Sequence, residues 1–161
     1  MSLDRDAAAL YSALSRLVRS YQFRDRERIC CHGISVTQCY ALEWLREEGP
    51  MRLAALADRL MLDTSTTSRV VDSLVRKHLA TRVEDPEDRR AVRLALTEPG
   101  KQLYERIRAE LIEEERAVLT DLTAEERRGA IKLLERLSLM AEERNAVCAS
   151  TPDEDVTAKS C

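Results

Sequence analysis

The chain has 161 residues, of which 34% are charged, and its net charge at pH 7 is -3. This length suits one domain that buries a core, and the net charge excludes a protein that holds nucleic acid over its whole surface. Glycine and proline are scarce, with four of each, and only 4% of the residues are aromatic, which is typical of long helices.

Two targeting patterns are missing from the sequence. No apolar segment reaches the ~18 residues that a membrane span needs, and no signal-peptide pattern opens the chain. The five cysteines are odd in number and unevenly spread, unlike a secreted disulfide framework. We therefore expect a cytoplasmic protein without a membrane partner, whose thiols are reduced at Cys30, Cys31, Cys39, Cys148 and Cys161.

The first two predicted elements are amphipathic helices. Apolar residues recur at spacings of three and four over residues 4–27, which predicts the first helix. Gly33 breaks this pattern, and Ser35 with Gln38 three residues later forms a capping box that starts the second helix. The Gly-Pro pair at 49–50 ends it.

Two shorter helices follow, at about 52–60 and 64–79, in the pattern of a helix-turn-helix unit, with Asp63 as N-cap of the second. The opening turns of the second helix hold five hydroxyl residues, which are poor helix formers, and one arginine. This composition favours contacts with phosphates and base edges of DNA; the alternative is N-terminal capping with a solvated face. The candidate contacts are Ser65, Thr66, Ser68, Arg69 and Arg76.

Alternating apolar residues over 80–96 then predict a β-hairpin, with a turn at Asp85–Asp88 and adjacent arginines, Arg89 and Arg90, at its tip. A helix fits the major groove of DNA and a cationic hairpin fits the minor groove. Residues 52–82 also hold six basic against three acidic residues. We predict a mainly α fold with a small β-hairpin wing, whose winged helix-turn-helix core, about 52–100, binds double-stranded DNA.

Long helices are predicted at 101–121 and 124–147, and a capping box of Thr123 with Glu126 starts the second of them. Their apolar stripes, with that of residues 4–27, are too long for the compact centre to cover, which predicts a homodimer. Such a dimer would meet a pseudo-palindromic operator whose half-sites lie about one helical turn apart. We expect a single domain over 1–148 and a disordered tail over 149–161.

Over about residues 4–147 the chain resembles the MarR family of bacterial transcriptional regulators. The most specific motif is the hairpin sequence DPEDRRAVRLALTEPG, which is similar to the family's Asp-x-Arg pattern followed by Leu-Thr and Gly. The resemblance implies that Asp88 orients the wing, that Arg90 enters the minor groove, and that Leu96 and Thr97 close the second strand. The related ArsR metalloregulators also have a winged helix, but the long helix pair after the wing favours MarR.

Three residues depart from the family pattern. Met61 and His78 stand where the family usually has glycine, and a left-handed conformation costs any other residue on the order of 1 kcal/mol. Thr67 replaces a usual apolar residue, which would soften the packing under the recognition helix.

The resemblance further implies a repressor that a small ligand or a thiol reaction releases from DNA, with a pocket between the first two helices and the long helix after the wing. Cys30, Cys31 and His32 precede the second helix, and Cys39 lies in its first turn, where the helix macrodipole is expected to lower the thiol pKa. These residues, which Cys148 could join, suit zinc, copper(I), arsenite or an oxidant. Modification would pull the second helix and change the separation of the recognition helices.

Three alternatives remain open. Cys39 would be a small core residue. The inducer would be a hydrophobic or aromatic molecule, and the candidate pocket walls are Tyr11, Tyr21, Tyr40 and Trp44. The chain would be a helical protein-interaction module, which salt-sensitive binding to duplex DNA would rule out. An enzyme is not expected, because no acid to orient His32 and no glycine-rich phosphate loop is evident.

Overall fold

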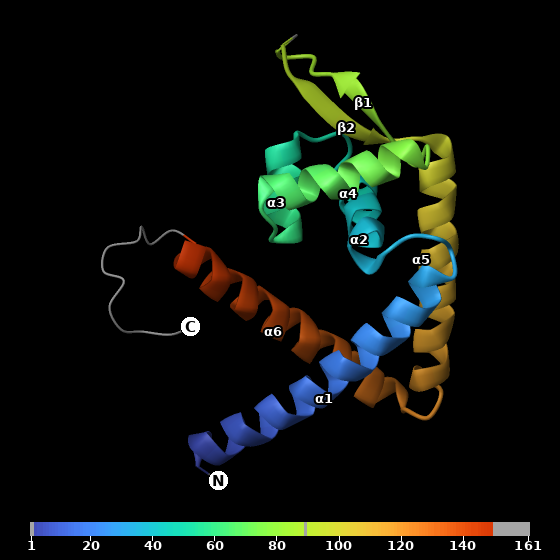
Figure 1. Ribbon diagram of the computed structural model, residues 1–161. Coiled ribbons are helices and arrows are strands. Elements are labelled where there is room, and N and C mark those ends of the chain that lie inside the picture. Colours follow the sequence, from blue (N-terminus) through green and yellow to red (C-terminus); the bar gives the residue numbers. More distant parts are fainter. Residues whose placement is uncertain (1, 89, 150–161) are drawn as a thin grey trace. The chain divides into compact units, whose positions relative to one another are not determined.

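The computed structural model describes residues 2–88 and 90–149, with side chains placed through residue 144 (Figure 1). In this part of the chain the elements are α1 (Leu3–Cys30), α2 (Val36–Glu47), α3 (Leu53–Leu60), α4 (Thr64–Arg76), β1 (Ala80–Glu84), β2 (Val92–Leu96), α5 (Glu98–Leu119) and α6 (Ala124–Ala149). The predicted fold class, mainly helical with one small hairpin, is confirmed. None of the described helices is long and apolar enough to cross a membrane.

The chain forms two compact units, Met1–Glu113 and Glu114–Cys161, and α5 runs from the first into the second. The single domain predicted over 1–148 stays a prediction. Residues 150–161 of the predicted tail lie outside the described residues.

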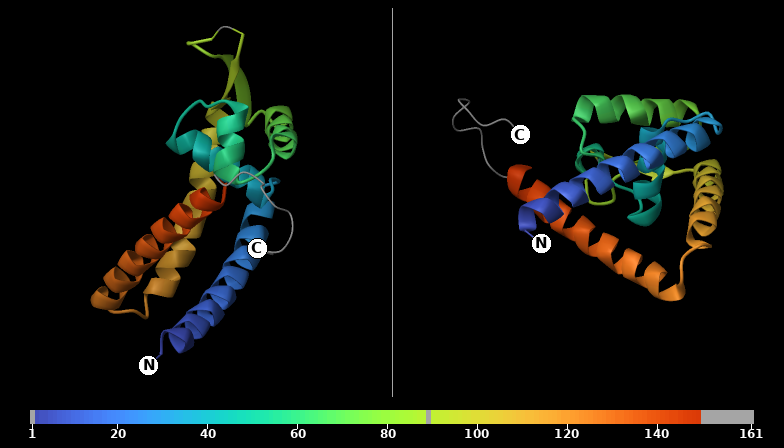
Figure 2. Two further views of the ribbon diagram at one scale, coloured as in Figure 1. Left: turned by 90° about the vertical axis from the view of Figure 1, so that its left-hand side faces the viewer. Right: turned by 90° about the horizontal axis from the view of Figure 1, so that it is seen from below.

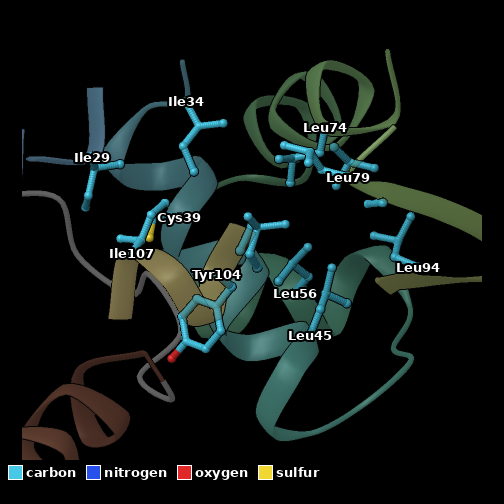
Figure 3. Packing of buried hydrophobic residues seen from close by; sticks show 14 of the residues in the cluster. Ile29, Ile34, Cys39, Leu45, Leu56, Leu74, Leu79, Leu94, Tyr104 and Ile107 are labelled. Carbon is cyan, nitrogen blue, oxygen red and sulfur yellow. The ribbon is translucent and has the colours of Figure 1, made fainter. Parts of the chain in front are cut away.

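The first unit holds a core to which the helices α1 to α5 contribute (Figure 3). Leu42 of α2, Leu56 of α3, Leu74 of α4 and Ile107 of α5 are each 0–1% exposed. Burying each such side chain contributes about 1.5–3 kcal/mol to folding. The core therefore fixes α2, α3, α4 and the first half of α5 against one another.

Helices α3 and α4 both end in a left-handed residue that is not glycine. Met61 has φ 51° and His78 has φ 58°. After His78 the amide of Leu79 donates to the carbonyl of Leu74 at 2.9 Å, which closes the end of α4. The helix consequently ends at Arg76, three residues before the predicted end, and the chain bears the conformational cost at both positions.

Thr67 does not leave a polar group unpaired in the core. It is fully buried, and its hydroxyl donates to the carbonyl of Asp63 at 3.0 Å. The predicted departure from the family pattern is therefore accommodated by a bond within α4.

The wing is an antiparallel hairpin in which Ala80 pairs with Leu96 and Glu84 with Val92. Met51, just before α3, adds a single bridge: its amide donates to Leu94 at 3.1 Å and its carbonyl accepts from Leu94 at 2.7 Å. The outer part of the hairpin projects beyond α3 and α4 (Figure 1; Figure 2, left). This bridge ties the middle of β2 to the segment that precedes α3.

The second unit contains the end of α5 and α6. The backbone amide and the hydroxyl of Thr123 donate to the Glu126 carboxylate at 2.8 and 2.7 Å, and the Glu126 amide donates back to the hydroxyl at 3.3 Å. These bonds lower the pKa of Glu126 and confirm the capping box that the sequence analysis places at the start of the last helix. Several apolar side chains of α6 are exposed, namely Ile131, Leu133, Leu134, Leu139 and Met140.

Candidate nucleic-acid interface and cysteine region

The first turn of α4 is organised by the carboxylate of Asp63. It accepts hydrogen bonds from the Thr66 amide at 2.8 Å, from the Ser65 hydroxyl at 2.5 Å and from the Thr66 hydroxyl at 2.6 Å. The two hydroxyl bonds, with the amide bond, hold the pKa of Asp63 well below its usual range. The capping reading of this turn is therefore correct for Ser65 and Thr66. Because their protons are engaged, their oxygens remain available as acceptors for a ligand.

Two arginines on α4 are placed to meet an anion. Arg69 and Arg76 are exposed, and neither has an ion-pair partner among the described residues, whereas Arg59 pairs with Glu48 at 2.7 Å. Arg82 is likewise neutralised, by Asp72 at 2.6 Å. The charge count of residues 52–82 therefore overstates the cationic surface, and Arg69 and Arg76 are its free part on α4. Ser68, which directly precedes Arg69, is half-buried.

The wing tip is shaped by Asp88. Its carboxylate accepts from the Arg90 amide at 3.0 Å, and its carbonyl accepts from the Ala91 amide at 2.8 Å. The side chain of Arg90 is exposed and without an ion-pair partner in the described part of the chain. Asp88 thus orders the backbone that presents Arg90, while Arg89 lies outside the described residues. That these residues contact DNA stays a prediction.

Asp85, which the sequence analysis treats only as a turn residue, is the buried acid of the wing. It is 1% exposed, and its carboxylate accepts from the Glu87 amide at 3.0 Å and from Arg52 Nε at 2.7 Å. Arg93 Nε lies 3.1 Å from the same oxygen as Arg52. The Glu87 amide, together with both guanidinium groups, holds the pKa of Asp85 well below its usual range.

The cysteine region does not form the predicted constellation. Cys30 and Cys31 are exposed and Cys39 is buried. No three His, Cys, Asp or Glu side chains among the described residues converge as metal ligands. His32 instead pairs with Glu110 of α5 at 2.9 Å. The side chain of Cys148 lies outside the described residues.

The expected activation of Cys39 is wrong. Burial, together with the nearby carboxylates of Glu43 and Asp25, raises the pKa of its thiol to about 12. Its sulfur lies among Ile29 and Ile107 (Figure 3). Desolvation and two nearby negative charges therefore outweigh the helix macrodipole, and Cys39 is a core residue.

A small cavity of about 90 Å³ lies between α1, α2 and α5, where the family resemblance places the sensing pocket. Of the four aromatic residues expected to line that pocket, Tyr40 lines this cavity and the other three do not. Tyr104, which the sequence analysis missed, does line it and donates to Glu43 Oε1 at 3.0 Å. The complete lining is Asp25, Ile29, Cys39, Tyr40, Glu43, Tyr104, Ile107, Arg108 and Leu111. The wall therefore mixes apolar, acidic and basic groups.

The comparisons with known proteins agree with this geometry. The model of the MarR family matches residues 34–92. The HTH-type transcriptional regulator MhqR of Bacillus subtilis is 31% identical over 134 residues, which is 83% of this chain and 92% of that protein. The transcriptional repressor MdtR of the same organism is 26% identical over 88% of this chain and 91% of its own length.

A solved structure supports the same assignment. A MarR family protein from Bacillus stearothermophilus superimposes with a TM-score of 0.82 and 28% identity, covering 88% of this chain and 99% of that one. These relatives are transcriptional regulators and not enzymes, as the sequence analysis expects. The chain belongs to the MarR family of DNA-binding transcriptional regulators.

Proposed function

We propose that the chain is a homodimeric repressor that binds a pseudo-palindromic operator. Each α4 would enter a major groove, and each wing would place Arg90 in the adjacent minor groove. The observation that supports this most is the presence of three exposed arginines without ion-pair partners among the described residues, Arg69 and Arg76 on α4 and Arg90 on the wing, in one compact unit. A bacterial operator places the protein in the cytoplasm.

Exposed apolar side chains support the homodimer. On α1 the exposed apolar residues include Leu10, Tyr11, Leu17, Val18 and Phe23, and α6 exposes a further set. Apolar surface on this scale marks an interaction site rather than a solvated face. A second copy would bury the same helices from both chains, which is the usual closed arrangement of a homodimer. The repressor role is taken from MdtR, whose name describes a repressor.

Two signals are candidates for release from DNA. The exposed pair Cys30 and Cys31 favours a thiol reaction, either with a thiophilic metal ion or a metalloid such as arsenite, or with peroxide, which converts a thiolate to a sulfenic acid. Cys31 lies two residues before Gly33, whose carbonyl accepts from Lys77 Nζ of the α4 C-cap at 2.5 Å. A modified thiol pair can therefore displace the end of the recognition helix.

The second candidate is a small hydrophobic or aromatic ligand in the cavity between α1, α2 and α5. At about 90 Å³ the cavity is far smaller than the ~300 Å³ of ordinary ligand pockets, so such a ligand would have to widen it. Widening would move α1 and α2 relative to α5. The loop between α1 and α2 is bonded to the C-cap of the recognition helix α4 through Gly33 and Lys77, so the movement would also reach that helix.

The test begins with selection of duplex fragments from the source genome by the purified protein. Affinity for a recovered duplex is then measured by fluorescence anisotropy across a range of salt concentrations. We expect Arg90→Ala and Arg69→Ala to weaken binding and to reduce the salt dependence by about 0.9 per lost phosphate contact. Arg59→Ala is the matched control, since Arg59 is exposed on α3 but paired with Glu48 at 2.7 Å. Binding by Arg90→Ala and Arg69→Ala equal to that of Arg59→Ala would contradict the proposal, and binding of protein alone would favour an interaction module.

A further inference from the structure

The buried carboxylate of Asp85 joins two elements that DNA binding requires to act together. Arg52, the N-cap of α3, and Arg93 of β2 both point their Nε atoms at the same oxygen of Asp85, at 2.7 and 3.1 Å. The side chain of Asp85 has no exposed surface, although the Arg52 side chain is 51% exposed. One carboxylate therefore links the wing to the start of the helix-turn-helix unit.

This link lies further along the hairpin than its other contacts with the helices. The backbone bridge between Met51 and Leu94 lies further in, and Arg82, which pairs with Leu94 in the register of the strands, also binds Asp72 of α4 at 2.6 Å. Asp85 lies three residues beyond Arg82 and five residues before Arg90. Without the contact of Asp85, the tip of the hairpin beyond Arg82 and Leu94 could pivot about this level. The contact of Asp85 with Arg52 opposes that pivot, because a buried, doubly paired carboxylate is costly to separate from its partners.

We propose that Asp85 is a positioning residue for DNA binding, which sets the wing at the angle that lets Arg90 and α4 engage one duplex together. This inference rests on the proposed function. It also means that Arg52 holds the wing through Asp85 and does not belong to the free cationic surface of the protein. Binding through α4 and Arg90 at the same time requires a fixed distance between them. A wing that pivots freely should therefore lower the affinity for DNA even though no residue that touches DNA is changed.

The sign of the expected effect separates this role from simple electrostatics. Asp85→Asn keeps the size of the side chain and removes a negative charge close to the DNA-facing side, which by charge alone should strengthen binding to phosphates. We expect the opposite, a loss of roughly tenfold in affinity. The single oxygen of an asparagine cannot accept from the two arginines and from the Glu87 amide at once, and its NH2 group would face a donor on one of the two sides.

The matched control is Glu87→Gln. Glu87 lies in the same turn and pairs with Arg93 at 3.3 Å, but its side chain is 79% exposed and has no bond to Arg52 among the described contacts. It makes the same change of charge, and we expect its affinity to be unchanged or slightly raised. A decrease in affinity like that of Asp85→Asn would show that the charge in the turn controls binding, and not the contact of Asp85 with Arg52 and Arg93.

A double-mutant cycle with Arg90→Ala tests the positioning role itself. If Asp85 acts by placing Arg90, Asp85→Asn should cost almost nothing further once Arg90 is truncated. An equal loss in both backgrounds overturns the inference, since it indicates a general structural defect. If Asp85→Asn does not fold, Arg52→Lys replaces it, because it keeps the positive charge and loses the Nε donor; parent-like affinity for Arg52→Lys likewise overturns the inference.

Different outcomes would contradict the proposed function and the role of Asp85. If the parent binds no duplex, or Arg90→Ala binds as the parent does, the proposed function itself is wrong. If the parent binds and Arg90→Ala weakens it while Asp85→Asn binds like Glu87→Gln, only the role of Asp85 is wrong.

Discussion

Substitution of Gly100 by alanine tests the packing at the junction of the recognition helix, the wing and α5. A Cβ atom at this position would lie 1.9 Å from the carbonyl oxygen of Leu79 and 2.9 Å from its carbonyl carbon. Leu79 is 8% exposed and follows the left-handed residue that ends α4. Because the added Cβ atom would clash with backbone atoms of Leu79, no change of rotamer relieves the clash, and α5 must move by about 1 Å or more.

The structure allows a rough magnitude for this change. Overpacking costs about 1–3 kcal/mol, and a backbone clash belongs at the upper end. Alanine is better than glycine in a helix by about 1 kcal/mol, which offsets part of this. We therefore expect Gly100→Ala to lower the free energy of unfolding by about 2 kcal/mol, or roughly 4–8 °C in Tm for a chain of this size.

The assay is thermal and urea unfolding followed by circular dichroism, at one fixed protein concentration since a dimer's Tm depends on it. Gly129→Ala is the matched control, because Gly129 lies within α6 and a Cβ there meets nothing within 4 Å. It should be neutral or stabilising by up to about 1 kcal/mol. A Gly100→Ala variant as stable as Gly129→Ala would refute the packing argument.

Three further predictions follow from the cysteines and from two polar contacts. Cys30 and Cys31 should react with a disulfide reagent at pH 8 in the folded protein, whereas Cys39, with a pKa of about 12 and 4% exposure, should react only on unfolding; rapid labelling of Cys39 itself, identified by peptide mass mapping, would contradict its burial. Lys77→Met should retain DNA binding but respond less to arsenite or peroxide, because the bond to Gly33 is lost; an unchanged response in the anisotropy assay would remove this route. Asp63→Ala should destabilise the protein at pH 7 by a margin that shrinks as the pH falls below about 4, since the pKa of Asp63 is lowered on folding from 3.8; a margin constant down to pH 2 in urea titrations would count against it.

Local patterns predicted the elements of this fold well. The capping boxes of Ser35 with Gln38 and of Thr123 with Glu126 are both present, and the two strands lie where alternation places them. Each of these depends on residues within a few positions of one another, so the sequence contains the complete cause. His78 shows the same for α4: the sequence flags the residue, and its left-handed conformation ends the helix early.

The missed features depend on partners distant in sequence. Asp85 owes its role to Arg52, 33 residues earlier, and no local pattern relates them. The error at Cys39 has a similar origin, because the macrodipole is a local effect while burial against α5 and the charges of Glu43 and Asp25 arise only in the folded chain. The charge count of residues 52–82 overstates the free cationic surface, because the pairing of Arg59 with Glu48 and of Arg82 with Asp72 cannot be read from composition.

The most direct test of the central claim is hydroxyl-radical footprinting on a duplex recovered by genomic selection. The account predicts two symmetric half-sites about one helical turn apart, roughly 10 bp, each flanked by minor-groove protection. In Arg90→Ala the flanking protection should disappear while weaker central protection by α4 remains. A footprint without two-fold symmetry, or flanking protection that persists in Arg90→Ala, would contradict a homodimer that reads DNA with α4 and the wing.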